Sequence, residues 1–135
     1  MHARLGVERD ADNACGQALL GEILFQLERN AEAASALERA VTLDPQHLGA
    51  GFTLGLARLD GDEPEAALQA FNTFCDGMPE DAEGHAFAAL AAARAGRREE
   101  AVHHDREAHR LEKTQDKSRL RRIYREIKEA LAEEA

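Results

Sequence analysis

The sequence predicts an all-α fold, an α-α superhelix of repeated helix pairs, on the basis of three observations. First, the stretch 14–47 returns 34 positions later, so that Leu20 and Gly21 are matched by Leu54 and Gly55. A fixed period of this length is typical of a helical solenoid. Second, aromatic residues make up only 4% of the chain, and strand-forming runs of Val, Ile, Thr and Tyr are absent. Third, apolar side chains recur at spacings of three and four, which places them on one helix face.

Residues 1–13 are predicted to be a lead-in to the first repeat, 14–47, because they show no strong apolar period. We expect Asp12 or Asn13 to cap the first helix, since its side-chain oxygen accepts an N–H group that has no partner inside the helix. The helix itself is predicted to carry a broad apolar stripe. This stripe consists of Ala18, Leu20, Ile23, Leu24 and Leu27.

Prolines mark the turns between the predicted helices. The second helix of the first repeat is expected to end near Leu43, because Pro45 disfavours the α conformation in the residue before it. In the second repeat, 48–81, Pro64 suits the first turn of a helix, where its missing N–H group is not needed. The third repeat, 82–113, is predicted to pair an alanine-rich helix with a charged one.

The C-terminal capping segment, 116–135, is predicted to contain a last amphipathic helix that follows a polar join at 114–118 and brings the total to seven helices. A solenoid needs an end cap with a polar outer side, because its last repeat otherwise leaves apolar surface in water. We expect this helix to cover the second helix of the third repeat. Its apolar residues share one face, and they are Leu120, Ile123, Tyr124, Ile127 and Leu131.

Small residues recur where two helices of a repeat should cross closely. Gly21 is expected to face Ala33 in the first repeat, and the second repeat has the same pair of residue types. Phe74 breaks this pattern, because a ring stands where the first repeat has Ala40. We expect the alanine-rich helix that follows to make room for the ring.

The composition is that of a soluble globular protein, with 44% hydrophobic residues, 32% charged residues and a net charge of −9. An acidic chain of this kind is a poor nucleic-acid binder, so we expect no nucleic-acid and no membrane partner. The basic residues of the last helix would suit a nucleic acid or an acidic lipid surface, but the glutamates between them favour a polar outer face. No apolar run is long enough for a membrane span. The two cysteines, Cys15 and Cys75, form no CxxC motif, so free thiols in the cytoplasm are expected.

The repeat resembles the tetratricopeptide repeat over residues 14 to about 113. The resemblance is carried by Leu20 and Gly21 in the first helix, by the small residues Ala33 and Ala40 in the second, and by the closing Pro45. It implies a non-catalytic protein-interaction module that binds a peptide or helix of a partner protein in an apolar concave groove. The alternative is a self-association or scaffold module, a homodimer in which a second copy or the chain's own terminal segment fills the groove.

The resemblance also implies which positions of the first helices line the groove. In related chaperone-binding members these positions hold Lys and Asn, which are absent from them here, so that activity is not carried over. The residues that stand there instead are mainly apolar with an acidic rim. They are Leu19, Glu22, Phe25, Phe52, Leu56, Leu59, Asp60, Glu83, Phe87, Leu90 and Arg94.

The sequence favours neither catalysis nor a cofactor. No arrangement of acid, base and nucleophile can be assembled from its motifs, and the HExxH pattern is absent. A metal binder or enzyme that uses His103, His104 and His109 is a distant third hypothesis, with His85 on the neighbouring helix as a further ligand. We expect no metal, and a solvated helix face for these histidines. Asp105 stands at an apolar position of the repeat. If it is buried, we expect an arginine of the last helix to pair with it.

Overall fold

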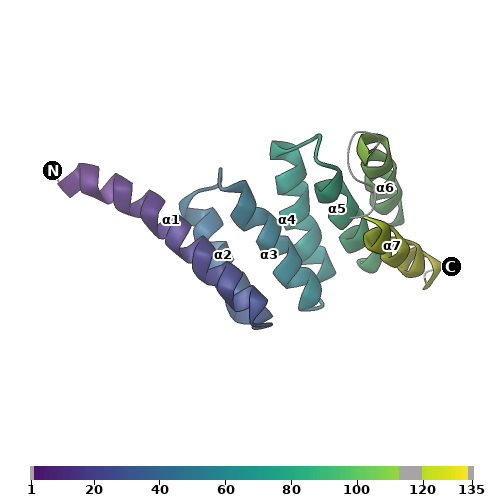
Figure 1. Cartoon of the computed structure of the whole chain (residues 1–135), viewed down its shortest axis with the longest axis horizontal. Helices are drawn as coiled ribbons and strands as arrows, with labels where there is room; N and C mark the ends of the chain where they lie inside the picture. Colours follow the sequence, from purple (N-terminus) through teal and green to yellow (C-terminus); the bar gives the residue numbers. More distant parts are fainter. Residues whose placement is uncertain (1, 113–119, 134–135) are drawn as a thin grey trace. The chain divides into compact units, whose positions relative to one another are not determined.

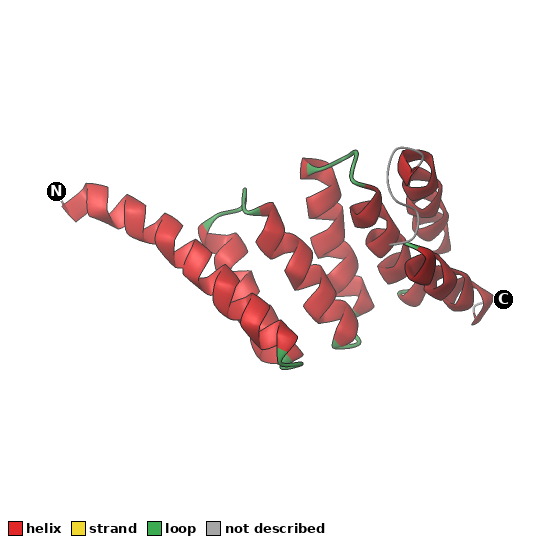
Figure 2. Cartoon of the chain, viewed as in Figure 1, coloured by secondary structure: helices red, strands yellow, loops and turns green. Residues whose placement is uncertain are grey.

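The chain is described by a computed structural model that covers residues 2–112 and 120–133, with side chains from residue 13 onward. Every secondary-structure element in these ranges is a helix (Figures 1 and 2). The predicted join at 114–118 and the start of the predicted last helix lie outside the described residues. The seven helices are α1 (His2–Gln26), α2 (Asn30–Leu43), α3 (Leu48–Asp60), α4 (Pro64–Gly77), α5 (Ala82–Arg94), α6 (Arg98–Glu112) and α7 (Arg121–Glu133).

Helix α1 is longer than the sequence predicted. It runs without interruption for 25 residues from His2, so Asp12 and Asn13 lie inside the helix and the predicted cap at these residues is wrong. The physical reason is that extending an existing helix fixes one residue for each new hydrogen bond, whereas starting one fixes several for the first. Arg, Leu and Glu in the segment 2–13 favour this extension.

The chain divides into two compact units, each described by itself. The first unit ends at Asp62 and contains α1, α2 and α3. The second unit begins at Glu63 and contains α4 to α7. The boundary between them falls between the two helices of the predicted second repeat.

Each turn between the paired helices contains one residue with positive φ. These residues are Glu28 (φ 63°), Asp62 (φ 61°) and Gly96 (φ 78°), and they are spaced by the same 34 positions as the sequence repeat. In the first turn the N–H group of Arg29 donates to the carbonyl oxygen of Leu24 (2.9 Å), five residues back. The third turn has the equivalent bond from Arg97 to Ala92, and this pattern with a left-handed residue is the Schellman ending of a helix.

Local signals in the sequence set the helix starts. Pro64 occupies the first turn of α4, as its sequence context predicted. The Asp81 carboxylate accepts the N–H group of Gly84 (3.1 Å) at the start of α5. The His47 ring accepts the N–H group of Ala50 (3.1 Å) at the start of α3.

The core of the first unit lies between α1 and α2. Ala33, Ala36, Leu37 and Ala40 form the buried face of α2. Gly21 of α1 lies against Leu37, and a Cβ atom at this glycine would come within 2.4 Å of the leucine Cγ atom. The predicted close crossing at Gly21 is therefore present, but Leu37, rather than Ala33, is the side chain that fills the space beside it.

Helix α5 is the centre of the second unit, because α4, α6 and α7 all contact it. Its alanines let three neighbours approach, and almost the whole helix is buried. Helix α7 covers it with Leu120, just before the helix, in a cluster with Ala82 and Ala86 of α5 and Ala108 of α6. The last helix therefore lies on the first helix of the third repeat as well as on the second. Within the described residues, no helix combines the length and apolar character needed to cross a bilayer.

Candidate protein-interaction surface

The groove residues predicted from the sequence fall into two sets, one in each unit. In the first unit, Phe25 of α1 and Phe52 and Leu56 of α3 are half-buried. Leu59 is buried in the core of this unit. The remaining members of this set, Leu19, Glu22 and Asp60, are exposed.

In the second unit, the predicted groove residues lie on α5. The Phe87 ring is half-buried and stacks on Phe71 of α4, with 5.7 Å between the ring centroids. Leu90 is fully buried, Glu83 is half-buried and Arg94 is exposed. Arg94 approaches Glu126 of α7, with 3.8 Å between guanidinium nitrogen and carboxylate oxygen. The last helix therefore lies against part of the surface that the sequence assigned to a partner.

The exposed apolar side chains of α1 form a surface that the sequence did not single out. Its members are 43–60% exposed, and spacings of three and four put most of them on one helix face. We call this surface the α1 apolar face, defined by Leu19, Leu20, Ile23 and Leu27. The broad apolar stripe predicted on the first helix is only partly buried, because Ala18 is buried while Leu20, Ile23 and Leu27 are exposed.

The repeat period explains why this face is exposed. Ile23 is 47% exposed, whereas Ala57 and Ala91, at the same position of the next two repeats, are 1% and 0% exposed. Helix α3 is contacted by α2 and helix α5 by α4, in each case the helix that precedes it. The repeat position that is buried on α3 and on α5 is open to solvent on α1.

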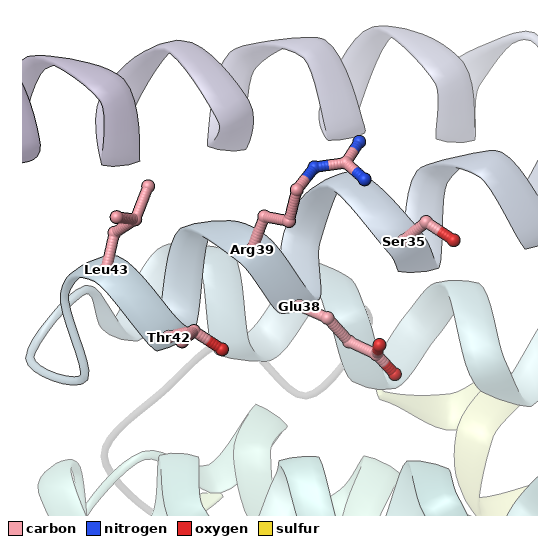
Figure 3. Close-up of a pocket in the computed structure, with 5 residues that line it drawn as sticks. All are labelled: Ser35, Glu38, Arg39, Thr42 and Leu43. Atoms are coloured by element: carbon pink, nitrogen blue, oxygen red, sulfur yellow. The ribbon is translucent and has the colours of Figure 1, made fainter.

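A shallow hollow of about 440 Å³ lies on α2 (Figure 3). All five of its lining residues come from this one helix. Its two charged side chains already have partners, because Glu38 pairs with Arg58 and the Nε atom of Arg39 donates to Gln17 of α1 (3.2 Å). The hollow therefore offers no convergent polar groups for a small ligand.

The histidine run of α6 does not converge on one point. The Nδ1 atom of His109 donates to the backbone oxygen of Asp105 (2.8 Å), and its ring stacks on Tyr124, with 3.9 Å between centroids. His103 is exposed, while His104 turns inward to His85 of α5. Asp105 is only half-buried, so the condition under which it would need an arginine of the last helix is not met. The carboxylate instead lies 3.5 Å from His109 one helical turn away, and it is partly solvated, so it needs no arginine.

Tyr124 of α7 packs against buried residues of α5 and α6. Burial raises the pKa of its hydroxyl group above the usual value, and the nearby Glu112 carboxylate adds to this rise. On the outer side of α7, Arg122 pairs with Glu126 (3.2 Å), so this basic side chain is matched by an acidic one on the same helix.

Helix pairs that repeat every 34 residues, with a left-handed residue at the same place in each turn, define a helical-repeat protein. Residues 17–47 match the tetratricopeptide repeat family. The predicted resemblance is thereby confirmed: the chain carries a tetratricopeptide repeat and has the helical-solenoid fold of these proteins.

Solved structures of MamA have the same fold. A crystal structure of MamA is 27% identical and has a TM-score of 0.70, and the match covers 77% of this chain and 57% of that chain. A second one is 26% identical at the same TM-score, over 77% of this chain and 61% of that one. A point mutant of MamA is 25% identical with a TM-score of 0.70, over 78% and 80%. The chain thus spans only about 57–61% of the first two proteins. No curated protein sequence matches it.

Proposed function

We propose that this chain is a non-catalytic protein-interaction module that binds a helix of another polypeptide on the α1 apolar face. The observation that carries the proposal is the contrast between Ile23, which is exposed, and its repeat equivalents Ala57 and Ala91, which are buried. Exposed apolar side chains gathered on one helix face are typical of an interaction site.

The chemistry of the face indicates the kind of partner. In the next two repeats the equivalent helices, α3 and α5, are each contacted by the helix that precedes them, so a helix is the element whose shape suits the face. A partner helix would present apolar side chains at spacings of three and four. The exposed Glu22 stands beside the face and favours basic residues at the edge of the partner helix. A helix of a second copy of the chain is the competing occupant.

The test is a pair of acidic substitutions in the full chain. Ile23→Glu with Leu27→Glu should weaken partner binding at least about tenfold, because central apolar anchors dominate binding energy. The matched control is Leu43→Glu, since Leu43 lies on α2 and is 42% exposed. Circular dichroism should show all variants equally folded. Affinity of the double variant for the partner equal to that of the control would overturn the proposal.

Light scattering over a dilution series separates the two occupants. If a second copy docks on the face, the native chain is a dimer that resists dilution, and the double variant is a monomer. If a different protein docks there, both are monomers, and only the native chain captures a helical partner from lysate of the source organism. If the double variant captures the partner as well as the native chain does, neither occupant docks on the α1 apolar face.

The groove predicted from the sequence is a second candidate surface. The half-buried Phe52 and Leu56 in the first unit support it, and so does the half-buried Phe87 in the second. Leu59 and Leu90 are buried, so their role there would be to support the exposed members. An acidic rim from Glu22, among others, suits a partner segment with apolar anchors and basic flanks.

A further inference from the structure

Three metal-ligating side chains meet inside the second unit, away from every surface discussed above. They are Cys75 on α4, His85 on α5 and His104 on α6. One potential ligand atom of each lies within 4.8 Å of the other two. The three residues are only 6%, 8% and 9% exposed. Three helices thus each contribute one buried donor to a common point.

The ring nitrogens of the two histidines are oriented for metal binding. Nε2 of His85 donates to the backbone oxygen of Pro79 (2.9 Å), and Nε2 of His104 donates to Oδ1 of Asn72 (3.0 Å). In a neutral histidine whose Nε2 carries the proton, Nδ1 is an acceptor with a free lone pair. The two Nδ1 atoms lie 2.9 Å apart, a hydrogen-bond distance. In one tautomer a proton lies between them, and in the other both lone pairs are directed at the same point, where a cation can bind.

The hydrogen-bond partners of the two rings have the character of a second coordination shell. Histidine ligands commonly donate their other N–H group to a backbone carbonyl or to a polar side chain, which fixes tautomer and ring orientation. Pro79 and Asn72 supply these acceptors here. In the metal-free chain, a half-turn of the Asn72 amide would let one proton stand between the Nδ1 atoms. The cluster therefore has two alternative states, one with a metal ion and one with a proton between the two Nδ1 atoms.

We propose that Cys75, His85 and His104 form a transition-metal site, and that Zn²⁺ is the ion this donor set fits best. Zinc binds thiolate sulfur at about 2.3 Å and imidazole nitrogen at about 2.0–2.1 Å in tetrahedral geometry. Ligand atoms of such a site lie roughly 3.3–3.6 Å apart. The Nδ1 atoms therefore separate by a few tenths of an ångström, and the thiol moves inward by a small side-chain rotation. Water takes the fourth position.

The surroundings of the cluster favour the entry of a cation. A surface hollow of about 340 Å³ is lined by the loop that follows α4, including Pro79, Glu80 and Asp81. Pro79 is the residue whose carbonyl oxygen holds His85. The two carboxylates at this hollow attract cations electrostatically.

Binding of the ion releases one proton. Burial, together with the charges of Asp81 and Asp76, raises the pKa of the Cys75 thiol to about 12, so the metal-free residue carries its proton at neutral pH. The zinc–sulfur bond forms as the S–H bond breaks and the proton passes to solvent, while both histidines remain neutral. Zinc affinity is therefore expected to rise with pH.

The site would join two predicted repeats. Cys75 belongs to the second repeat, and the two histidines belong to the third. Zinc would hold α4 to α5 and α6 by coordinate bonds in addition to side-chain packing. We expect it to stabilise the second unit, because an ion that binds the folded chain in preference to the unfolded chain shifts the equilibrium towards folding.

The experiment uses the full chain carrying Cys15→Ser, which removes the exposed cysteine. After treatment with a chelator, the protein is titrated with Zn²⁺ and, separately, with Co²⁺. We expect one equivalent of Zn²⁺ to bind and to raise the thermal midpoint. We also expect the Co²⁺ form to show a sulfur-to-cobalt charge-transfer band with the intensity of a tetrahedral site.

Variants assign the ligands. Cys75→Ala should abolish the charge-transfer band, and His104→Gln should weaken zinc binding at least about a hundredfold. Asn72→Ala should weaken it by about 10–100-fold through loss of ring orientation. His103→Gln is the matched control, because this exposed histidine adjoins the cluster, and it should bind as the parent does.

The proposal falls if the parent chain shows no stoichiometric zinc binding and no charge-transfer band, a result that depends on no variant. It also falls if Cys75→Ala binds as tightly as the parent. Circular dichroism of the metal-free variants shows whether they are folded. If a variant does not fold, the cobalt spectrum of the parent chain alone decides whether the proposal stands.

Discussion

Gly84 of α5 lies directly against the aromatic ring of Phe74 of α4. A Cβ atom at this glycine would come within 2.7 Å of Phe74 Cε1 and within 2.8 Å of Cδ1. The sequence placed a phenylalanine where the first repeat has a small residue, and predicted that alanines of the next helix make room for it. The structure shows that Gly84 is a residue that makes this room.

Gly84→Ala should therefore destabilise the chain. Overpacking of a buried contact costs about 1–3 kcal/mol of unfolding free energy, because the ring has to move. Adding Phe74→Leu to Gly84→Ala should recover part of the loss, since the smaller side chain leaves space for the new methyl group. Urea denaturation of the two single variants and the double variant measures this coupling. Strictly additive effects would show that the two residues do not share the space.

The left-handed turn residues allow a second test. Glu28 has φ 63° and is not a glycine, whereas Gly96 has φ 78°. Left-handed conformation costs a residue with a side chain about 1–2 kcal/mol. Glu28→Gly should thus raise stability by up to about 1 kcal/mol after the larger chain entropy of unfolded glycine is subtracted. Gly96→Ala should lower it by about 1 kcal/mol. Thermal melts of both variants should move in opposite directions, and shifts of the same sign would contradict this account.

Ile127 tests the role of α7. It is among the largest fully buried side chains, so Ile127→Ala should lower the unfolding free energy by about 2–5 kcal/mol. Lys128→Ala, at an exposed neighbouring position, should change it by less than about 0.5 kcal/mol. Truncation before residue 120 should expose α5 and promote aggregation. A truncated chain that remains monomeric and equally stable would mean that α7 is dispensable for the second unit.

His104 makes the stability of the metal-free chain depend on pH. Burial, followed by the charges of His85 and His103, lowers its pKa from 6.5 to about 4. The unfolded chain therefore takes up a proton as the pH falls below 6.5, while the folded chain does not. The stability from this residue is fully present above pH 6.5 and is lost as the pH falls towards 4.

Urea denaturation between pH 7.5 and roughly 4, in the presence of a chelator, measures this dependence. His104→Gln should show a shallower fall in unfolding free energy than the native chain. His103→Gln removes only the smallest of the three causes that lower the pKa of His104, so its profile should stay closer to that of the native chain than the profile of His104→Gln does. Parallel pH profiles for the native chain and His104→Gln would show that the His104 ring is protonated to the same extent in the folded and the unfolded chain.

Phe52 and Leu54 are close in sequence but should behave differently on mutation. Leu54 is buried in the first unit, so Leu54→Ala should cost about 2–5 kcal/mol of stability. Phe52 is half-buried, so Phe52→Ala should cost less stability but at least about 1–2 kcal/mol of partner affinity. Melting temperature and partner affinity are measured for each variant. If Phe52→Ala unfolds the chain as severely as Leu54→Ala, the ring belongs to the core and the groove hypothesis is wrong.

The local order of helices could be predicted because local signals set it. Pro45 and Pro64 act on their own backbone and immediate neighbours, and the 34-residue period shows the same pattern more than once. The start of α1 was missed because helix extension through residues 2–13 needs no apolar period. The tetratricopeptide resemblance was correct because it rests on spacing, which side-chain changes such as Phe74 do not alter.

The sequence by itself determined the all-α class, the repeat period and the approximate ends of most helices. Only the tertiary structure decided which side of each helix is covered. Ile23 and Ala57 occupy the same repeat position, yet burial depends on whether a neighbouring helix is present, and no residue records this locally. The same holds for Cys75, His85 and His104, which no short motif connects. Their meeting depends on the packing of α4, α5 and α6, because distances between side chains on different helices are set by the core and not by the spacing of residues along the chain.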